Sequence, residues 1–458
     1  MSASLSGPMS APMTAVYAAP PATYAATDDA ALFRRARTWW TLAAICLIAD
    51  GNGFLGQQDN TYYHQRVAEK FSSDPVFLLI TITTWVICAA LMAGHLAPTL
   101  RTMWKQKPLL AVAAFAVVST LWSAYPSVTF RKAILLFLTF AFAWFFATYY
   151  SPADQRRILL AAGVIMVIAS LAWVVLLPTY GIASTGEVAG EWKGVFGQKN
   201  DLGIAMVAFF SLLPFRRIPN LRRLLVLALQ ALVPVFLIVR AHARESLILA
   251  ALFVGIRVLG PIIARSRREQ LPFILYIAVS GIVGTFLAWG TVLSLLGKGA
   301  VDSWSGRLNE WSAVVPYISR HLWLGYGFAG FWTGEGDSLS VMKSLHVSTR
   351  GSDSGYTDNM LSFGLIGMSI LLIVVLVSVR DFLRLLRRPA VPFMAYWYVG
   401  FILLTWVEAV VGDTFPLPGT VTTFIFVVAC CGLTHLRSGF LSDGGRPLSS
   451  EMRLAVQD

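Results

Sequence analysis

Long apolar runs recur along almost the whole sequence, and this recurrence constrains the fold more than any other feature. A helix that crosses a membrane needs about 20 mostly apolar residues. Candidate runs of roughly this kind are Thr38–Leu55, Val76–Ala97, Pro108–Trp122, Ala133–Tyr149, Ile158–Leu177, Leu202–Phe215, Leu224–Val239, Leu247–Ile263, Pro272–Leu296, Met360–Val379, Val391–Val411 and Leu417–Leu433. We therefore predict an all-α, polytopic integral membrane protein with about 12 transmembrane helices.

The composition excludes the soluble alternatives. Hydrophobic residues make up 56% of the chain and charged residues only 13%, whereas a soluble domain has about 45–50% and about 25%. A soluble fold could not bury this much apolar surface and still cover itself with polar groups. A cytosolic enzyme, a secreted disulfide scaffold and a disordered chain are therefore excluded. The 4 cysteines lie in apolar runs, so we predict no disulfide and no Cys-x-x-Cys metal site.

The distribution of positive charge predicts the topology. The net charge of +12 does not indicate nucleic acid here, because lysine and arginine accumulate on the cytoplasmic loops of membrane proteins. With the N-terminus inside and the spans alternating, most of the 36 lysine and arginine residues fall on inner loops. We predict a multi-pass membrane protein with both termini cytoplasmic. Its parts are a disordered tail (1–37), a transmembrane domain (38–436) and a C-terminal tail (437–458).

One long loop, residues 298–359, separates the ninth and tenth predicted spans and should face the periplasm. Apolar residues recur in it at helical spacing at Leu308, Trp311, Val315, Ile318 and Leu322. We expect a helix that lies along the membrane surface. Six aromatic residues crowd the same stretch: Trp304, Trp311, Trp323, Phe328, Phe331 and Trp332. They serve either as interfacial anchors or as platforms that stack on sugar rings.

Polar residues of the predicted outer face concentrate in four places. These are Gly194–Gly203, which includes Phe196-Gly-Gln-Lys199-Asn200, then Arg240–Ser246, Ser305–Arg307 and Asp353–Asn359. Gly325-Tyr-Gly327 lies in the long loop, and Gly364-Leu-Ile-Gly367 follows the fourth segment.

In order and spacing these segments resemble the O-antigen ligase and polysaccharide polymerase superfamily, which includes exopolysaccharide production proteins. The resemblance extends over roughly residues 190–370. Ligases of this superfamily usually have histidine where this chain has Asp353, whereas several of its polymerases carry an aspartate there. The departure weakens the ligase interpretation more than the polymerase interpretation.

The resemblance implies a glycosyltransferase of the bacterial inner membrane that acts at the periplasmic face. The predicted outer loops hold no His-x-x-x-His, no clustered thiols and no Asp-x-Asp, so we expect transfer without a metal or cofactor. It would use an undecaprenyl-pyrophosphate-linked glycan as donor and polymerise oligosaccharide repeat units of an exopolysaccharide or O-antigen. One alternative is an O-antigen ligase that transfers finished glycan to lipid A core. An alternative of another class is a transporter, or flippase, of lipid-linked glycans. The implied partners are that donor, membrane lipids and a chain-length regulator or other export proteins, without nucleic acid.

The chemistry of a pyrophosphate leaving group selects the candidate residues. Arginine offers a planar fork of donors to phosphate oxygens and stays protonated, and a carboxylate can serve as base for the acceptor hydroxyl. We predict Arg244, Arg307 and Asp353 as catalytic residues. The predicted substrate-binding residues are Lys199, Asn200, Arg240, His346, Tyr356 and Asp358. Each has a structural alternative, since such side chains also solvate loops, grip lipid headgroups or cap helices.

Overall fold

The computed structural model describes residues 28–50, 75–183, 189–197, 199–213, 221–265, 298–345, 351–386, 391–410, 412 and 415–438. Within these ranges the chain is helical, and its single β-type contact is the isolated bridge between Ile182 and Trp192. The all-α prediction is confirmed for this part of the chain. The chain divides into two compact units, Met1–Trp39 and Trp40–Asp458. The first is described only as the beginning of one helix, so the account below concerns the second.

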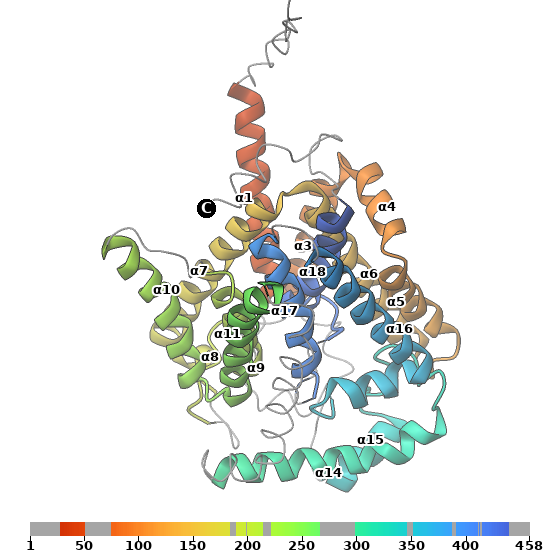
Figure 1. The fold of residues 1–458 in the computed structure, drawn as a ribbon. Coiled ribbons are helices and arrows are strands. Elements are labelled where there is room, and N and C mark those ends of the chain that lie inside the picture. The colour runs from red at the N-terminus through yellow and green to blue at the C-terminus, as the bar shows by residue number, and fades with distance from the viewer. Residues whose placement is uncertain are drawn as a thin grey trace, which may run out of the picture. The chain divides into compact units, whose positions relative to one another are not determined.

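The helices follow one another as labelled in Figure 1. They are α1 (Asp28–Asp50), α3 (Pro75–Ala93), α4 (Leu96–Lys105), α5 (Lys107–Val118), the 3-10 turn η2 (Ser119–Leu121), α6 (Pro126–Tyr149), α7 (Pro152–Leu176), α8 (Pro178–Gly181), α9 (Lys199–Phe210), α10 (Leu221–Arg240), α11 (Arg244–Arg265), α14 (Lys298–Arg320), α15 (Gly336–Leu345), α16 (Gly355–Leu385), α17 (Phe393–Glu408) and α18 (Val421–Ser438).

Every predicted apolar run overlaps one or two of these helices except Pro272–Leu296, which lies outside the described residues. Among the described residues, four helices, α6, α7, α16 and α18, are long and apolar enough to cross a membrane. The α3–α4 pair would be a fifth, broken span, because the chain bends by 97° between them. The count of 12 spans stays a prediction. Helix α1 begins at Asp28, inside the segment predicted as a tail, whereas residues 1–27 and 439–458 are not described.

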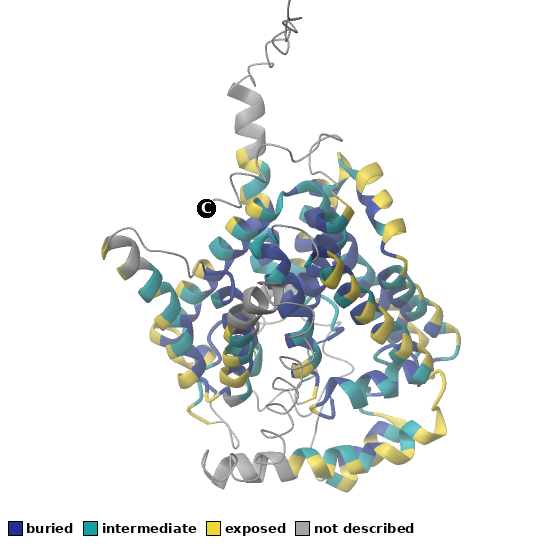
Figure 2. Ribbon diagram, in the orientation of Figure 1, coloured by how far each residue is buried: buried dark blue, intermediate teal, exposed yellow. Residues whose placement is uncertain are grey.

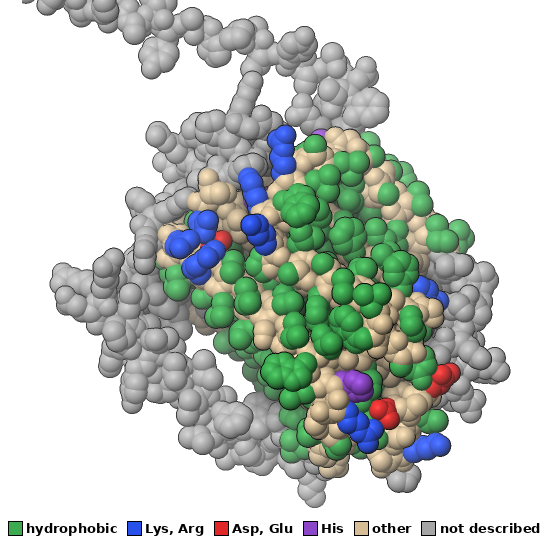
Figure 3. All heavy atoms as spheres, turned by 90° about the vertical axis from the view of Figure 1, so that its right-hand side faces the viewer, with side chains coloured by type: hydrophobic (Ala, Val, Ile, Leu, Met, Phe, Trp, Pro, Cys, Tyr) green, Lys and Arg blue, Asp and Glu red, His purple; other side chains and the backbone are tan. Residues whose placement is uncertain are grey.

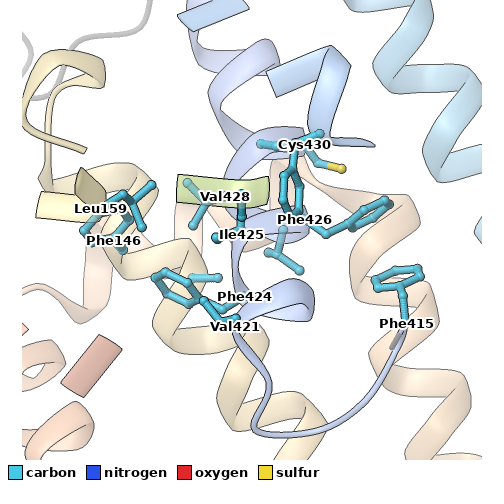
Figure 4. Close-up of a cluster of buried hydrophobic side chains, with 14 of the residues drawn as sticks. Phe146, Leu159, Phe415, Val421, Phe424, Ile425, Phe426, Val428 and Cys430 are labelled. Carbon is cyan, nitrogen blue, oxygen red and sulfur yellow. The ribbon is translucent and has the colours of Figure 1, made fainter. Parts of the chain in front are cut away.

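Helix α18 lies in the core. Its residues from Val421 to Leu433 are all buried, as expected of a helix that is apolar on all sides. It packs against α6, α16 and α17. Figure 4 shows the aromatic side chains at this contact, where the rings of Phe146 and Phe424 lie 5.4 Å apart and those of Phe415 and Phe426 4.1 Å apart. Figure 2 shows the buried segments concentrated in these central helices.

Buried polar side chains join helices inside the core. The Tyr398 hydroxyl donates to Oε1 of Gln155 at 2.6 Å, which links α17 to α7. The Trp397 indole donates to the Ser211 hydroxyl at 2.7 Å, just beyond the end of α9. Hydrogen bonds of this kind are a common way to hold helices together in a membrane protein, where lipid is as apolar as the helix faces.

The outer helices expose apolar stripes, the reverse of a soluble protein. Helix α4 buries Thr99 and Thr102 and exposes large apolar side chains on its opposite face. The exposed stripes are Leu96, Leu100 and Trp104 on α4, and Leu225, Leu229, Leu232, Phe236 and Val239 on α10. Figure 3 shows one face of this surface, where hydrophobic side chains cover the middle of the face and charged side chains lie toward its ends. Such a surface is typical of a protein that faces lipid.

A break in α16 fixes the turn that follows α14. Gly364 has φ 59°, and a Cβ at this position would lie 2.4 Å from the carbonyl carbon of Trp323. The close approach lets the two backbones pair: the Leu365 N–H donates to the Leu322 carbonyl at 2.8 Å, and the Tyr326 N–H donates to the Leu361 carbonyl at 2.7 Å. The Gly364 segment and Gly325-Tyr-Gly327 are therefore one docking contact between the long loop and the helical bundle.

A buried ion cluster lies near the other end of α16. Asp381 is 2% exposed, and its carboxylate lies 2.8 Å from a guanidinium nitrogen of Arg437 and 3.0 Å from one of Arg380. Thr434 also donates to this carboxylate, at 3.2 Å. The cluster ties α16 to α18 at the end of α16 opposite to the polar loop that precedes Gly355.

Candidate active site

Helix α14 supplies one wall of the candidate site. The helical spacing predicted a helix here, and α14 confirms it, but the predicted apolar stripe divides between two faces. Trp311 and Ile318 turn inward with the buried Val314. Leu308, Val315 and Leu322 are 48%, 56% and 37% exposed. Arg307, Glu310 and Trp311 thus lie on the side of α14 that faces the protein.

Arg307 is the centre of a charged cluster. Its side chain is only 14% exposed. One terminal nitrogen lies 3.5 Å from Oε1 of Glu245 in the first turn of α11, and Nε lies 3.9 Å from Oδ2 of Asp353 in the loop before α16. Three segments far apart in the sequence therefore converge on one guanidinium group.

Lys199 begins α9 and belongs to the same neighbourhood. Its Nζ lies 2.8 Å from Oε2 of Glu191, and the other carboxylate oxygen of Glu191 lies 3.5 Å from Nδ1 of His242. The positive charge of Lys199 also acts on Asp353, whose pKa it lowers. Lys199 and Arg307 thus act on one carboxylate from two different helices.

Asp353 has an uncommon backbone conformation and a carboxyl group whose pKa is raised. Its φ of 48° is in the left-handed region, which aspartate tolerates better than most residues. Burial by the surrounding protein raises the pKa of the carboxyl above its usual value, and the charges of Arg307 and Lys199 partly oppose this rise. The side chain remains 56% exposed, so solvent moderates these effects.

Glu310 is a site residue that the sequence analysis missed. Burial, together with the nearby charge of Asp353, raises the pKa of this carboxyl to about 7, although Arg307 opposes the rise. Its Oε2 is buried and has no hydrogen-bond partner among the described residues. The signal that could have found it is its spacing: residues three apart on a helix share a face, and Glu310 is three residues from Arg307. Glu245, beside the predicted Arg244, was missed as well.

Asp358 holds the loop that carries Asp353. Its carboxylate accepts hydrogen bonds from the Trp332 indole at 2.8 Å, and from the Ser352 backbone N–H and hydroxyl at 3.1 Å and 2.8 Å. On the other side of the loop, the Trp311 indole donates to the Ser352 carbonyl at 3.0 Å. Both indole N–H groups are thus engaged within the fold, and the geometry gives Asp358 a structural role.

Replacing Asp358 by asparagine should therefore lower the stability of the protein. The amide loses the charge and turns one acceptor into a donor that faces existing donors, so we expect a loss of about 1–3 kcal/mol. Asp353→Asn is the matched control, since that carboxylate is half exposed and only loosely paired. Thermal melting of the detergent-purified protein measures both variants. Equal melting temperatures for Asp358→Asn and the wild type would contradict the role given to Asp358.

The remaining predicted residues lie in varied surroundings. The Tyr356 hydroxyl donates to the Trp406 carbonyl at 2.8 Å, so it is engaged in the packing of α16 on α17. The Arg240 guanidinium lies 4.8 Å from the ring centre of Trp192. Asn200 has a buried Oδ1 without a hydrogen-bond partner among the described residues. The backbone of Arg244 begins α11, but its side chain and the whole of His346 lie outside the described residues.

The arrangement can bind an anion and accept a proton. The cations of Arg307 and Lys199 are paired with carboxylates that a stronger anion could replace, and the carboxyl of Glu310, with a pKa of about 7, interacts with the charge of Arg307. In the part of the chain that the structure describes, no three His, Cys, Asp or Glu side chains are placed to hold a metal ion.

Comparison of the chain with protein-family models and with curated proteins finds no match.

Proposed function

We propose that this protein is a bacterial inner-membrane glycosyltransferase that polymerises undecaprenyl-pyrophosphate-linked oligosaccharide repeat units at the periplasmic face. The observation that carries the proposal is the convergence of Arg307, Lys199 and Asp353 from α14, α9 and the loop before α16. The sequence motifs on which the resemblance rests supply all three residues.

The chemistry of the donor fits these side chains. When the bond from the anomeric carbon to the pyrophosphate breaks, negative charge builds on the leaving oxygen. Arg307 is well placed to stabilise it, because a guanidinium held away from water interacts more strongly than an exposed one. Fixed donors in such sites contribute about 3–4 kcal/mol each to a transition state. A carboxylate of the cluster would accept the proton of the acceptor hydroxyl.

The membrane setting also supports this class of substrate. A polyprenyl donor stays in the bilayer, so its enzyme must combine lipid-facing helices with a polar site near one membrane face. The exposed apolar stripes on α4 and α10 and the charged cluster before α16 meet these two needs. A transporter would instead carry polar groups near the middle of its spans. The twelve-span topology with cytoplasmic termini belongs to this proposal.

Purified protein should lengthen lipid-linked glycan. The assay mixes the protein in liposomes with lipid-linked repeat units extracted from a deletion strain of the source organism, and separates the products by size. A ladder of lipid-linked chains that grows by whole repeats is the expected result. If lipid A core is added as an acceptor, transfer of glycan to it without a ladder would identify a ligase. Movement of substrate across the bilayer without a new glycosidic bond would identify a transporter and refute the proposal.

A further inference from the structure

Glu310 is held in a defined position beside the charged cluster. It lies one helical turn from Arg307 on the same side of α14, next to Trp311. Because the Trp311 indole is hydrogen-bonded to the Ser352 carbonyl at 3.0 Å, α14 is fixed against the loop that carries Asp353. The segments that carry the two carboxyl groups are therefore joined, and the charges of Glu310 and Asp353 interact.

The surroundings of Glu310 leave one hydrogen bond unmade. Its Oε2 is buried, and no group of the described residues donates to it. A buried carboxylate oxygen without a donor is costly, and the cost disappears when the group binds a proton or accepts a hydrogen bond from a ligand. A sugar hydroxyl is a donor of the required kind. Asp353, by contrast, already lies near Arg307 and is more exposed.

We infer that Glu310, rather than Asp353, accepts the proton of the acceptor sugar hydroxyl, and that Asp353 is a positioning residue. The inference rests on the proposed function. In the reaction, the acceptor oxygen forms a bond to the anomeric carbon of the donor while its proton passes to the Glu310 carboxylate. The bond from that carbon to the pyrophosphate breaks, and its electron pair leaves with the pyrophosphate, beside Arg307 and Lys199. Glu310 then releases the proton to water.

The charges around Glu310 suit this task. Burial raises the pKa of Glu310, the charge of Asp353 on the loop raises it further, and the charge of Arg307 on the same helix lowers it. Two further charged groups act on Glu310 indirectly. Glu245 on α11 pairs with Arg307, and the charge of Lys199 on α9 lowers the pKa of Asp353. The resulting pKa of about 7 is near the optimum for a general base at neutral pH. The base form is populated above this value, so the transfer rate should rise with pH.

Two variants distinguish the carboxyl groups. With the extracted lipid-linked repeat units as substrate, Glu310→Gln should lower the transfer rate roughly 10²-fold and abolish the rise centred near pH 7. Asp353→Asn should lower the rate less than Glu310→Gln does, and it should move the midpoint of the pH profile to lower pH, because it removes the negative neighbour that raises the pKa of Glu310. Glu310→Asp, which keeps a carboxyl, should restore part of the activity.

A measurement without turnover tests the same assignment. In infrared spectra recorded between pH 5 and 9, a protonated-carboxyl band that is present in wild type and absent in Glu310→Gln should titrate near pH 7. Full activity and an unchanged pH profile in Glu310→Gln, or abolished transfer in Asp353→Asn alone, would overturn the inference and leave the proposed function standing. An inactive wild-type protein would overturn the proposed function itself.

Discussion

Replacing Arg307 by alanine is expected to lower the rate of glycan transfer about 10³-fold, the upper part of the range for the loss of one fixed donor. The effect should be large because the guanidinium is 14% exposed and lies between Glu245 and Asp353. The substitution removes the charge that would meet the leaving pyrophosphate. It also leaves two carboxylates that repel the pyrophosphate. The initial rate of repeat addition in liposomes measures this change.

Two further variants separate charge, geometry and folding. Arg307→Lys keeps the charge but loses the planar fork, so its rate should lie between those of the wild type and Arg307→Ala. Arg320→Ala is the matched control on the same helix: this arginine is 58% exposed and pairs with Asp337 at 3.3 Å, and its loss should leave the rate within about twofold. If Arg307→Ala retained more than half of the wild-type rate while folded, the proposed site would be wrong.

Replacing Gly364 by alanine should destabilise the protein by roughly 3–5 kcal/mol, since backbone strain and overpacking each contribute about 1–3 kcal/mol. Gly364 has φ 59°, and the new Cβ would lie 2.4 Å from backbone atoms of Trp323. Neither backbone segment can shift without breaking the hydrogen bonds that Leu365 and Tyr326 make across this contact. Thermal melting should show the loss. Proteolysis should show a newly accessible segment after Arg320.

Gly255→Ala is the control for this prediction. Gly255 lies within α11, and a Cβ there would meet nothing within 4 Å. Alanine in a helix interior is favoured over glycine by about 1 kcal/mol, so this variant should be as stable as the wild type or more stable. A Gly364→Ala protein that melts with the wild type would show that the docked turn does not depend on the glycine.

The core helix α18, the bend between α3 and α4 and the break in α16 show how much of the fold the sequence predicts. The residues of α18 are apolar on every side, and this property alone predicts a buried helix. The bend of 97° between α3 and α4 was not predicted, because Val76–Ala97 reads as one continuous apolar run. The break at Gly364 was not predicted either, because it depends on close packing against the backbone of a turn some forty positions earlier in the chain.

The residues of the candidate site also fall into those that the sequence predicts and those that it does not. Arg307, Lys199 and Asp353 could be selected from residue type and motif order, and the structure brings them into one neighbourhood. Asp358 and Tyr356 were selected by the same reasoning, yet their polar atoms are engaged in the fold. Glu310 was missed because its chemistry depends on burial and on Asp353, a neighbour from another segment.

Sequence alone determined that the described part of the chain is helical, and that the whole sequence is rich in segments suited to lipid and carries many basic residues between them, because these properties follow from residues a few positions apart. Only the tertiary structure decided which charges meet. Arg307 and Glu245 are 62 positions apart, and the interaction of two charges depends on their distance and on the water between them. Burial and distance are set by the packing of helices, which no local pattern of residues encodes.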